Sequence, residues 1–323
     1  MYPALLFLAI SRHDVRAGHI WQTICMKITG LHLLLTYQCN FECDHCFVWG
    51  SERQTGTMTS RNIELILDQA AETGTVEWIY FEGGEPFLYY DTLVSGVQAA
   101  AAAGFQTGIV TNAAWADSEA QARRLLKPFA GLVQDLSISS DAYHWSERYQ
   151  DHIDRARAAA RRLAIPTDLI SIAQPGDANT EQPSGQIPAG ESAVVFRGRA
   201  AAKLACHARQ HPWEQYTECP FEDLREPGRV HLDPLGFVHI CQGISLGNFF
   251  ERPLREIFEG YDPDAHPITG LLLRGGPAEL VRANGVPCHP GYADACHLCY
   301  ETRRHLRQQY PEELAPGQVY GVI

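Results

Sequence analysis

The stretch LHLLLTYQCNFECDHCF, residues 31–47, joins an apolar run to three closely spaced cysteines. Its first part, residues 31–36, is typical of a buried strand because leucine dominates it. Cys39, Cys43 and Cys46 follow directly with the spacing C-x3-C-x2-C. Three thiolates on one tight loop can hold three irons of a [4Fe-4S] cube. The fourth iron then has no protein ligand and stays open to another molecule, as in catalytic metal sites.

A zinc site is the alternative for these three cysteines. Zinc usually takes four nearby ligands, and His32 or His45 could supply the fourth. The ten cysteines of the chain are clustered, and at 323 residues the chain does not need disulfides to hold a small fold together. Clustered thiols in such a chain favour metal or cluster ligation, and with it a cytoplasmic location.

Outside this stretch, apolar strands alternate with amphipathic helices. The expected strands cover residues 31–36, 76–81, 105–111, 133–139, 168–173 and 192–196. The expected helices cover residues 59–73, 90–103, 118–126 and 145–164, with Thr59 or Ser60 as the first N-cap. This alternation predicts parallel βαβ units, and so an α/β fold with a partial (β/α)6 TIM-like barrel. Residues 174–191 are rich in Pro, Gly, Ser and Asp and predict a long loop.

After about residue 205 the pattern changes to short, turn-rich elements. Strands over 229–233 and 237–241 predict a hairpin, and short helices are expected over 253–260, 267–274 and 296–309. The change predicts a barrel followed by a small cysteine-rich α+β domain. The expected organisation is an N-terminal extension over 1–25 (or a segment packed on the barrel), a barrel over 26–205, an auxiliary domain over 206–310 and a tail over 311–323.

Composition narrows the function classes. The chain is 45% hydrophobic and 20% charged, which is typical of a globular protein. No run of about 18 apolar residues is present, so no membrane partner is expected. The net charge of -12 argues against a nucleic-acid partner, because non-specific binding needs clustered Lys and Arg.

A second group of cysteines lies in the last third of the chain. It consists of Cys219, Cys241, Cys296 and Cys299. Four thiolates are enough to saturate one further [4Fe-4S] cluster. A structural zinc site is the alternative here too. Cys288 could replace one ligand or stay a free thiol, and Cys206 is more remote.

Both cysteine groups resemble those of one enzyme family. The stretch CNFECDHCF, residues 39–47, its place after a strand and aromatic Phe47 resemble the radical S-adenosylmethionine (radical SAM) superfamily, especially its peptide maturases and sulfatase-maturing enzymes. HLDPLGFVHICQGISLGN, residues 231–248, is similar to the hairpin of the SPASM/twitch auxiliary domains. The cysteine count favours the smaller, one-cluster twitch form.

The resemblance implies roles for the sequence FEGGEP, residues 81–86. In radical SAM enzymes this glycine-rich motif binds the ammonium group of SAM. Gly83, Gly84 and Glu85 would take that role here, with Pro86 shaping the turn. Without the resemblance, the same residues could form an ordinary strand-to-helix turn.

Three later strand ends complete the implied cofactor site. Asn112 matches a Thr-Asn-Gly pattern, although Ala113 replaces the glycine and weakens the match. Ser139 and Asp141 match a Ser-x-Asp pattern near the ribose, or could cap the next helix. Arg197 is the candidate partner of the SAM carboxylate, or could be an ordinary surface charge.

The implied reaction is reductive cleavage of SAM at the first [4Fe-4S] cluster. The resulting 5′-deoxyadenosyl radical abstracts hydrogen from a substrate, and an auxiliary [4Fe-4S] cluster assists oxidation. The expected partners are a peptide or small-molecule substrate, an electron donor of the flavodoxin or ferredoxin type and a separate precursor-peptide-binding protein. Tyr143, His144 and Trp145 could face the substrate. The alternative is a non-catalytic Fe–S sensor or scaffold, which would have no need for the Gly-Gly-Glu-Pro motif.

Overall fold

The computed structural model describes residues 26–144, 147–175 and 192–322. The expectations for residues 1–25, for Trp145 and for most of the predicted loop over 174–191 lie outside the described residues. The tail is described up to residue 322.

Eight strands and eight helices make up the described part of the chain. The strands are β1 (Ile28–Thr36), β2 (Trp78–Gly83), β3 (Gln106–Thr111), β4 (Val133–Ser139), β5 (Thr167–Ile170), β6 (Gly228–Leu232), β7 (Phe237–Cys241) and β8 (Ile244–Asn248). The helices are α1 (Ser60–Thr73), α2 (Tyr90–Ala102), α3 (Glu119–Leu126), α4 (Glu147–Arg162), α5 (Arg199–Lys203), α6 (Leu254–Gly260), α7 (Thr269–Asn284) and α8 (Ala295–Leu306). Short 3-10 turns are η1 (Pro86–Tyr89), η2 (Lys127–Phe129), η3 (Ala205–His207), η4 (Trp213–Gln215) and η5 (Gly317–Tyr320).

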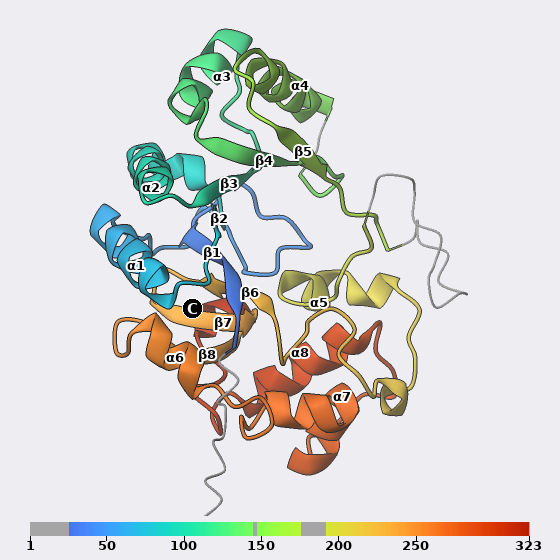
Figure 1. The fold of residues 1–323 in the computed structure, drawn as a ribbon. Coiled ribbons are helices and arrows are strands. Elements are labelled where there is room, and N and C mark those ends of the chain that lie inside the picture. The colour runs from blue at the N-terminus through green and yellow to red at the C-terminus, as the bar shows by residue number, and fades with distance from the viewer. Residues whose placement is uncertain (1–25, 145–146, 176–191, 323) are drawn as a thin grey trace, which may run out of the picture.

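All eight strands belong to one sheet with the order β5-β4-β3-β2-β1-β6-β7-β8. Strands β1 to β5 are parallel, β6 pairs in parallel with β1, and β7 and β8 continue as antiparallel strands. Figure 1 shows α1 to α4 along the outside of the parallel strands, with the C-terminal elements at the other end of the sheet. The carboxyl ends of β1 to β5 therefore meet at one edge, where function is expected in α/β folds.

The predicted α/β fold with a parallel sheet is confirmed, but its sixth strand is not where the sequence suggested. Ser192 makes only an isolated bridge with Ile172, and no strand covers residues 192–196. The backbone N–H of Phe196 donates instead to the Asp294 carboxylate at 3.2 Å. The sheet is extended at its opposite edge, where β6 of the C-terminal hairpin pairs with β1.

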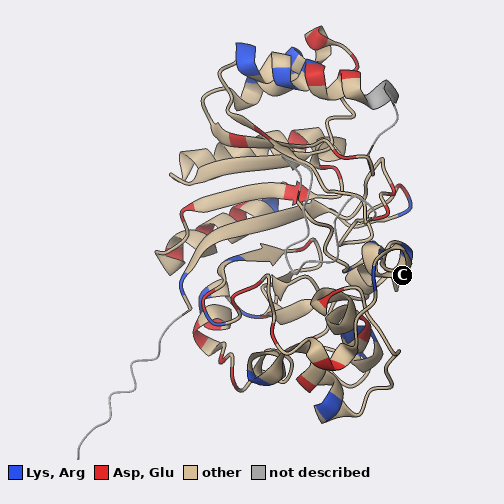
Figure 2. Cartoon of the chain, turned by 90° about the vertical axis from the view of Figure 1, so that its right-hand side faces the viewer, with Lys and Arg blue, Asp and Glu red and all other residues tan. Residues whose placement is uncertain are grey.

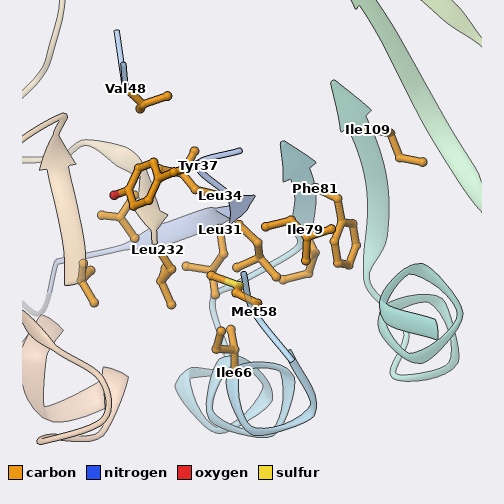
Figure 3. Packing of buried hydrophobic residues seen from close by; sticks show 14 of the residues in the cluster. Leu31, Leu34, Tyr37, Val48, Met58, Ile66, Ile79, Phe81, Ile109 and Leu232 are labelled. Carbon is orange, nitrogen blue, oxygen red and sulfur yellow. The ribbon is translucent and has the colours of Figure 1, made fainter. Parts of the chain in front are cut away.

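Apolar side chains on both sides of the central strands explain why helices cover the sheet. Figure 3 shows Leu31, Ile79, Met58 and Ile66 packed together between the strands and α1. All four are at most 1% exposed. The expected N-cap is confirmed at Thr59, whose hydroxyl accepts from the N–H of Asn62 in a capping box.

The C-terminal hairpin is confirmed as β6 and β7, but two neighbouring elements were missed. The sequence after β7 forms a third strand, β8, because a turn at Gly243 with φ 83° reverses the chain at once. The helix expected over 267–274 continues as α7 after a break at Gly275 and Gly276, just before Pro277. Two glycines followed by a proline explain the break.

Charged residues are interspersed along the chain. Figure 2 shows acidic and basic residues side by side, including those on α4 at the top of the view. Among the described residues, no helix is both long and apolar enough to cross a bilayer.

Candidate functional site

The first three cysteines lie on the loop that follows β1. Cys39 and Cys43 are buried and Cys46 is half-buried. The Cys46 N–H donates to the Cys43 carbonyl at 3.1 Å, which keeps this part of the loop tight. A Cβ placed on Gly50 would meet the Cβ of Cys39 at 3.4 Å and the Sγ of Cys46 at 3.5 Å, so both side chains flank one backbone position.

These thiols have the chemistry of cluster ligands rather than of free nucleophiles. Burial raises the pKa of Cys39 to about 12 and raises that of Cys43 further. Without a cation the Cys39 and Cys43 thiols would stay protonated, and a bound metal removes such protons. Three thiols on one loop, two of them buried, therefore fit an iron–sulfur cluster with one open iron.

Arg199 holds this loop from the start of α5, and sequence reasoning missed it. Its guanidinium donates to the carbonyl of Cys43 at 2.7 Å and to that of Gly50 at 2.8 Å. The side chain is only 3% exposed. Gly198 has φ 61° and lies so close to Phe47 that a Cβ would clash with its backbone. The only sequence signal was the Arg-Gly-Arg stretch, which does not say which arginine points inward.

A cavity of about 490 Å³ opens beside the three cysteines. The predicted site residues on its wall are Cys39, Cys43, Cys46, Gly83, Gly84, Asn112 and Ser139. Four other predicted residues, Glu85, Pro86, Asp141 and Arg197, do not line it. The cavity is large enough for a drug-sized molecule.

The Gly-Gly turn after β2 lies directly against the cysteine loop. The Gly84 N–H donates to the Thr36 carbonyl at 2.7 Å, and the Glu85 N–H donates to the Gln38 carbonyl at 2.9 Å. A Cβ on Gly84 would overlap the Gln38 carbonyl, and Gly83 has φ 128°. The two glycines are thus needed for the close approach of the two loops.

The Glu85 carboxylate points into the protein and joins the ends of β2 and β3. It accepts from the Thr111 hydroxyl and the Asn112 N–H, both at 2.8 Å, and from the Phe87 N–H at 3.1 Å. Burial raises the pKa of Glu85 to about 7, although these donors oppose the shift. Glu85 therefore shapes the wall of the cavity, and Pro86 begins η1 behind it.

Asn112 connects the end of β3 to the cysteine loop. Its side-chain amide donates to Asn40 Oδ1 at 2.9 Å and lies 3.6 Å from Sγ of Cys39. Ala113, which replaces the glycine of the expected Thr-Asn-Gly pattern, has φ 58°. The left-handed turn is therefore kept despite the substitution, at a steric cost.

Asp141 is buried beneath two histidines at the cavity wall. Its carboxylate lies 2.7 Å from Nδ1 of His144 and 3.7 Å from Nε2 of His45. Burial would raise the pKa of Asp141, but His144 and His45 lower it. Burial lowers the pKa of His45 to about 4. Asp141 thus orients His144, which lines the cavity while Asp141 does not.

The second group of cysteines also meets in one place. Cys219, Cys241, Cys296 and Cys299 line one enclosed pocket. Asp294 caps α8 by accepting from the His297 N–H, so the first two turns of the helix present Cys296 and Cys299. Burial raises the pKa of Cys219 to about 12 and raises those of Cys296 and Cys299. Four thiols on one pocket, two of them buried and two half-buried, fit a saturated cluster.

The two remaining described cysteines do not line this pocket. Cys206 is exposed, and its Sγ lies 3.7 Å from the Lys203 carbonyl. Cys288 lies 3.6 Å from the Val286 carbonyl. The structure therefore favours the set of four over a set that includes Cys288.

Arg197 does not lie where its predicted role requires. Its Nη1 lies 3.3 Å from Oε1 of Glu222 and 3.6 Å from Sγ of Cys241, in the pocket of the second group. The guanidinium also stands over the Phe47 ring, 5.6 Å from its centre. We therefore correct the expectation that Arg197 binds the SAM carboxylate. The chain turns at Val195 instead of continuing as a sixth strand, and this carries the arginine away from the cavity.

A polar cluster that the sequence did not reveal reaches the wall of the cavity through His32 and Glu82. Glu82 lies 3.1 Å from Nδ1 of His32 and 3.3 Å from Nε2 of His231. Burial would raise the pKa of Glu82, but its interactions with the two histidines lower it well below its usual value. The sequence indicated Glu82 only as part of the strand before the Gly-Gly turn, and His231 only as part of the hairpin.

Comparison with known proteins agrees with this arrangement of loops. Residues 33–171 match the model of the Radical SAM superfamily. The chain carries a radical SAM domain. The match begins within β1 and ends just after β5, so it covers the cysteine loop and the Gly-Gly turn.

A short region of the chain also matches an individual protein. YydG of Bacillus subtilis (strain 168), named for peptide biosynthesis, is 31% identical over 111 residues, which are 34% of this chain and 35% of YydG. The matched region thus spans about a third of that relative.

Three solved structures are distantly similar. BtrN in complex with AdoMet and 2-DOIA has a TM-score of 0.49 at 15% identity over 77% of this chain and 88% of BtrN. Streptococcus suis SuiB bound to precursor peptide SuiA has a TM-score of 0.46 at 16% identity over 84% of this chain and 76% of SuiB. Native anSMEcpe with bound AdoMet has a TM-score of 0.49 at 11% identity over 88% of this chain and 97% of anSMEcpe.

Proposed function

We propose that this chain is a radical SAM enzyme that modifies a peptide or protein side chain. Cys39, Cys43 and Cys46 would hold a [4Fe-4S] cluster, and SAM would bind in the adjoining cavity. This cofactor pair supplies a 5′-deoxyadenosyl radical, which abstracts hydrogen from the substrate. The observation that carries the proposal is that the three thiols and the Gly83–Gly84 turn flank one cavity of about 490 Å³.

The chain's own residues would bind SAM and keep water away. Gly83 and Gly84 allow the ligand to approach the backbone, and Asn112 and Ser139 offer polar groups on the same wall. Glu85 fixes the distance between the loops after β2 and β3. Enclosure suits a reactive radical, because the protein's part is to orient the reactants and exclude side reactions.

A second [4Fe-4S] cluster would be held by the cysteines of the C-terminal pocket. With four thiolates it has no open iron, so its role would be to take up an electron from the substrate. We expect an external flavodoxin or ferredoxin to supply electrons to the first cluster. We also expect a cytoplasmic location, where thiols stay reduced. The similarity to YydG supports a peptide substrate. A separate protein could then present the precursor peptide.

The test is SAM cleavage by the anaerobically reconstituted protein. After addition of SAM and dithionite, chromatography should detect 5′-deoxyadenosine. The Cys43→Ala variant should form none, whereas the matched control Cys206→Ala should behave like the wild type because Cys206 is exposed and outside both groups. The Cys299→Ala variant should still cleave SAM but bind fewer irons. A protein with both clusters that does not cleave SAM would instead be the non-catalytic sensor.

A further inference from the structure

Two histidines and a glutamate converge inside the barrel from three neighbouring strands. His32 lies on β1, Glu82 on β2 and His231 on β6, and His32 and His231 are direct register partners. One ligand atom of each side chain lies within 4.8 Å of the other two. His32 and Glu82 line the same cavity as the first cysteine group. The site therefore exists only because the C-terminal hairpin pairs with the first barrel strand.

Hydrogen bonding within the protein does not satisfy this cluster. Glu82 and His231 are each only 9% exposed. Yet Oε1 of Glu82 makes no hydrogen bond, although it lies 3.3 Å from Nε2 of His231, and Nδ1 of His231 is buried without a hydrogen-bond partner. Buried polar atoms without partners are costly and rare, and each one calls for an explanation. A ligand bound between the three side chains would explain why Oε1 of Glu82 makes no hydrogen bond within the protein.

The geometry and chemistry of the three groups fit a metal ion. Zinc binds imidazole nitrogen and carboxylate oxygen at about 2.0–2.2 Å, which places neighbouring ligands of a tetrahedral site about 3.3–3.5 Å apart. The distances of 3.1 Å and 3.3 Å from Glu82 to the two histidines are close to this separation. Two imidazoles and one carboxylate with open positions are a common set for divalent zinc and iron.

We propose that His32, Glu82 and His231 form a mononuclear site for a divalent transition metal ion, with Zn²⁺ as its test ion. One carboxylate leaves the bound ion with a net positive charge, and its open positions face the cavity. It would therefore bind an oxygen of the substrate, such as a peptide carbonyl or carboxylate. This substrate role rests on the proposed function, whereas metal binding itself does not.

The experiment measures zinc in the reconstituted protein, whose cysteines are occupied by clusters. Protein is equilibrated with micromolar ZnSO₄ and desalted, and its zinc content is measured by mass spectrometry. X-ray absorption at the zinc edge then distinguishes nitrogen and oxygen ligands from sulfur. We expect about one zinc per chain with imidazole ligands and no sulfur.

Variants identify the site. Glu82→Gln and His231→Gln should each weaken zinc binding by at least about tenfold, whereas His305→Gln, on the exposed face of α8, should not. Equal zinc retention in all variants, sulfur ligands or no zinc in the wild type would each overturn the proposal. If one variant fails to incorporate clusters, the other variant and the wild-type absorption spectrum still decide.

SAM cleavage by the same samples is scored separately. Zinc bound by these residues without SAM cleavage would refute the proposed activity and leave the metal site intact. SAM cleavage without zinc binding would refute the metal site and leave the proposed activity intact. The two proposals therefore fail in different ways.

Discussion

Replacing Tyr37 with phenylalanine tests how strongly the barrel is joined to the C-terminal hairpin. The Tyr37 hydroxyl donates to Oδ2 of Asp233 at 2.6 Å, and the two residues are 1% and 0% exposed. Tyr37 precedes the cysteine loop, and Asp233 lies at the turn between β6 and β7. This bond therefore links two segments that are far apart in the sequence.

The structure sets the size of the effect. A hydrogen bond to a charged group contributes about 1.5–3 kcal/mol. Asp233 keeps three other donors in the variant, namely the N–H groups of Leu235 and Phe237 at 2.9 Å and Nε2 of His239 at 3.1 Å. Because the carboxylate stays partnered, we expect Tyr37→Phe to lower the free energy of unfolding by about 2 kcal/mol.

The assay is urea unfolding of the reconstituted protein under anaerobic conditions, followed by fluorescence. The matched control is Tyr310→Phe, which removes a bond of 3.1 Å from a half-buried tyrosine to the neutral side chain of Asn284. The control should lose no more than about 1 kcal/mol. Equal losses in the two variants would refute the reasoning.

The pH dependence gives a second check on Tyr37. Burial, together with Asp233, raises the pKa of Tyr37 well above its ordinary value of 10.0. The folded state thus favours the neutral phenol, so this contribution is fully present below pH 10.0 and is lost as the pH rises through the higher folded pKa. The difference in free energy of unfolding between the wild type and Tyr37→Phe should therefore shrink as the pH rises above 10.0.

Three further predictions concern the two cysteine groups. Gly84→Ala should lower the iron content of the reconstituted protein, because its Cβ would overlap the Gln38 carbonyl beside Cys39; Gly260→Ala, with open space around it, is the control. Asp294→Ala should lower the free energy of unfolding by about 1 kcal/mol by uncapping α8, measured in urea against the exposed α3 cap variant Ser118→Ala. Arg197→Gln should lower the reduction potential of the second cluster, because a positive charge 3.6 Å from Cys241 favours the reduced state of the cluster. The potential is measured by a redox titration followed by electron paramagnetic resonance, and an unchanged potential would contradict the reasoning. Arg225→Gln, which removes an exposed ion pair, is the control.

Local patterns in the sequence predicted most of the barrel elements. The apolar residues Ile63, Ile66, Leu67 and Ala70 recur at helical spacing, and all of them face the core in α1. The cap at Thr59 needs only its own helix, so it too could be read from neighbouring residues. The expected strand over 192–196 failed because its backbone finds partners that lie far away in the chain, such as Asp294.

Side-chain roles that depend on partners far away in the chain could not be predicted from the sequence. Arg197 and Arg199 are two residues apart, yet one lies beside Cys241 and the other holds the carbonyl of Cys43. Their separation follows from the conformation of Gly198, with φ 61°, against the backbone of Phe47. No periodicity in the sequence indicates this turn.

The parallel α/β pattern and the two groups of cysteines can be read from the sequence alone, because strand alternation and C-x3-C-x2-C spacing are local properties. The pairing of β6 with β1, which brings His231 beside His32 and Glu82, is visible only in the folded protein. The physical reason is that strand pairing is made between residues that are distant in the chain. Register between β1 and β6 depends on the packing of the whole sheet, which no stretch of sequence contains.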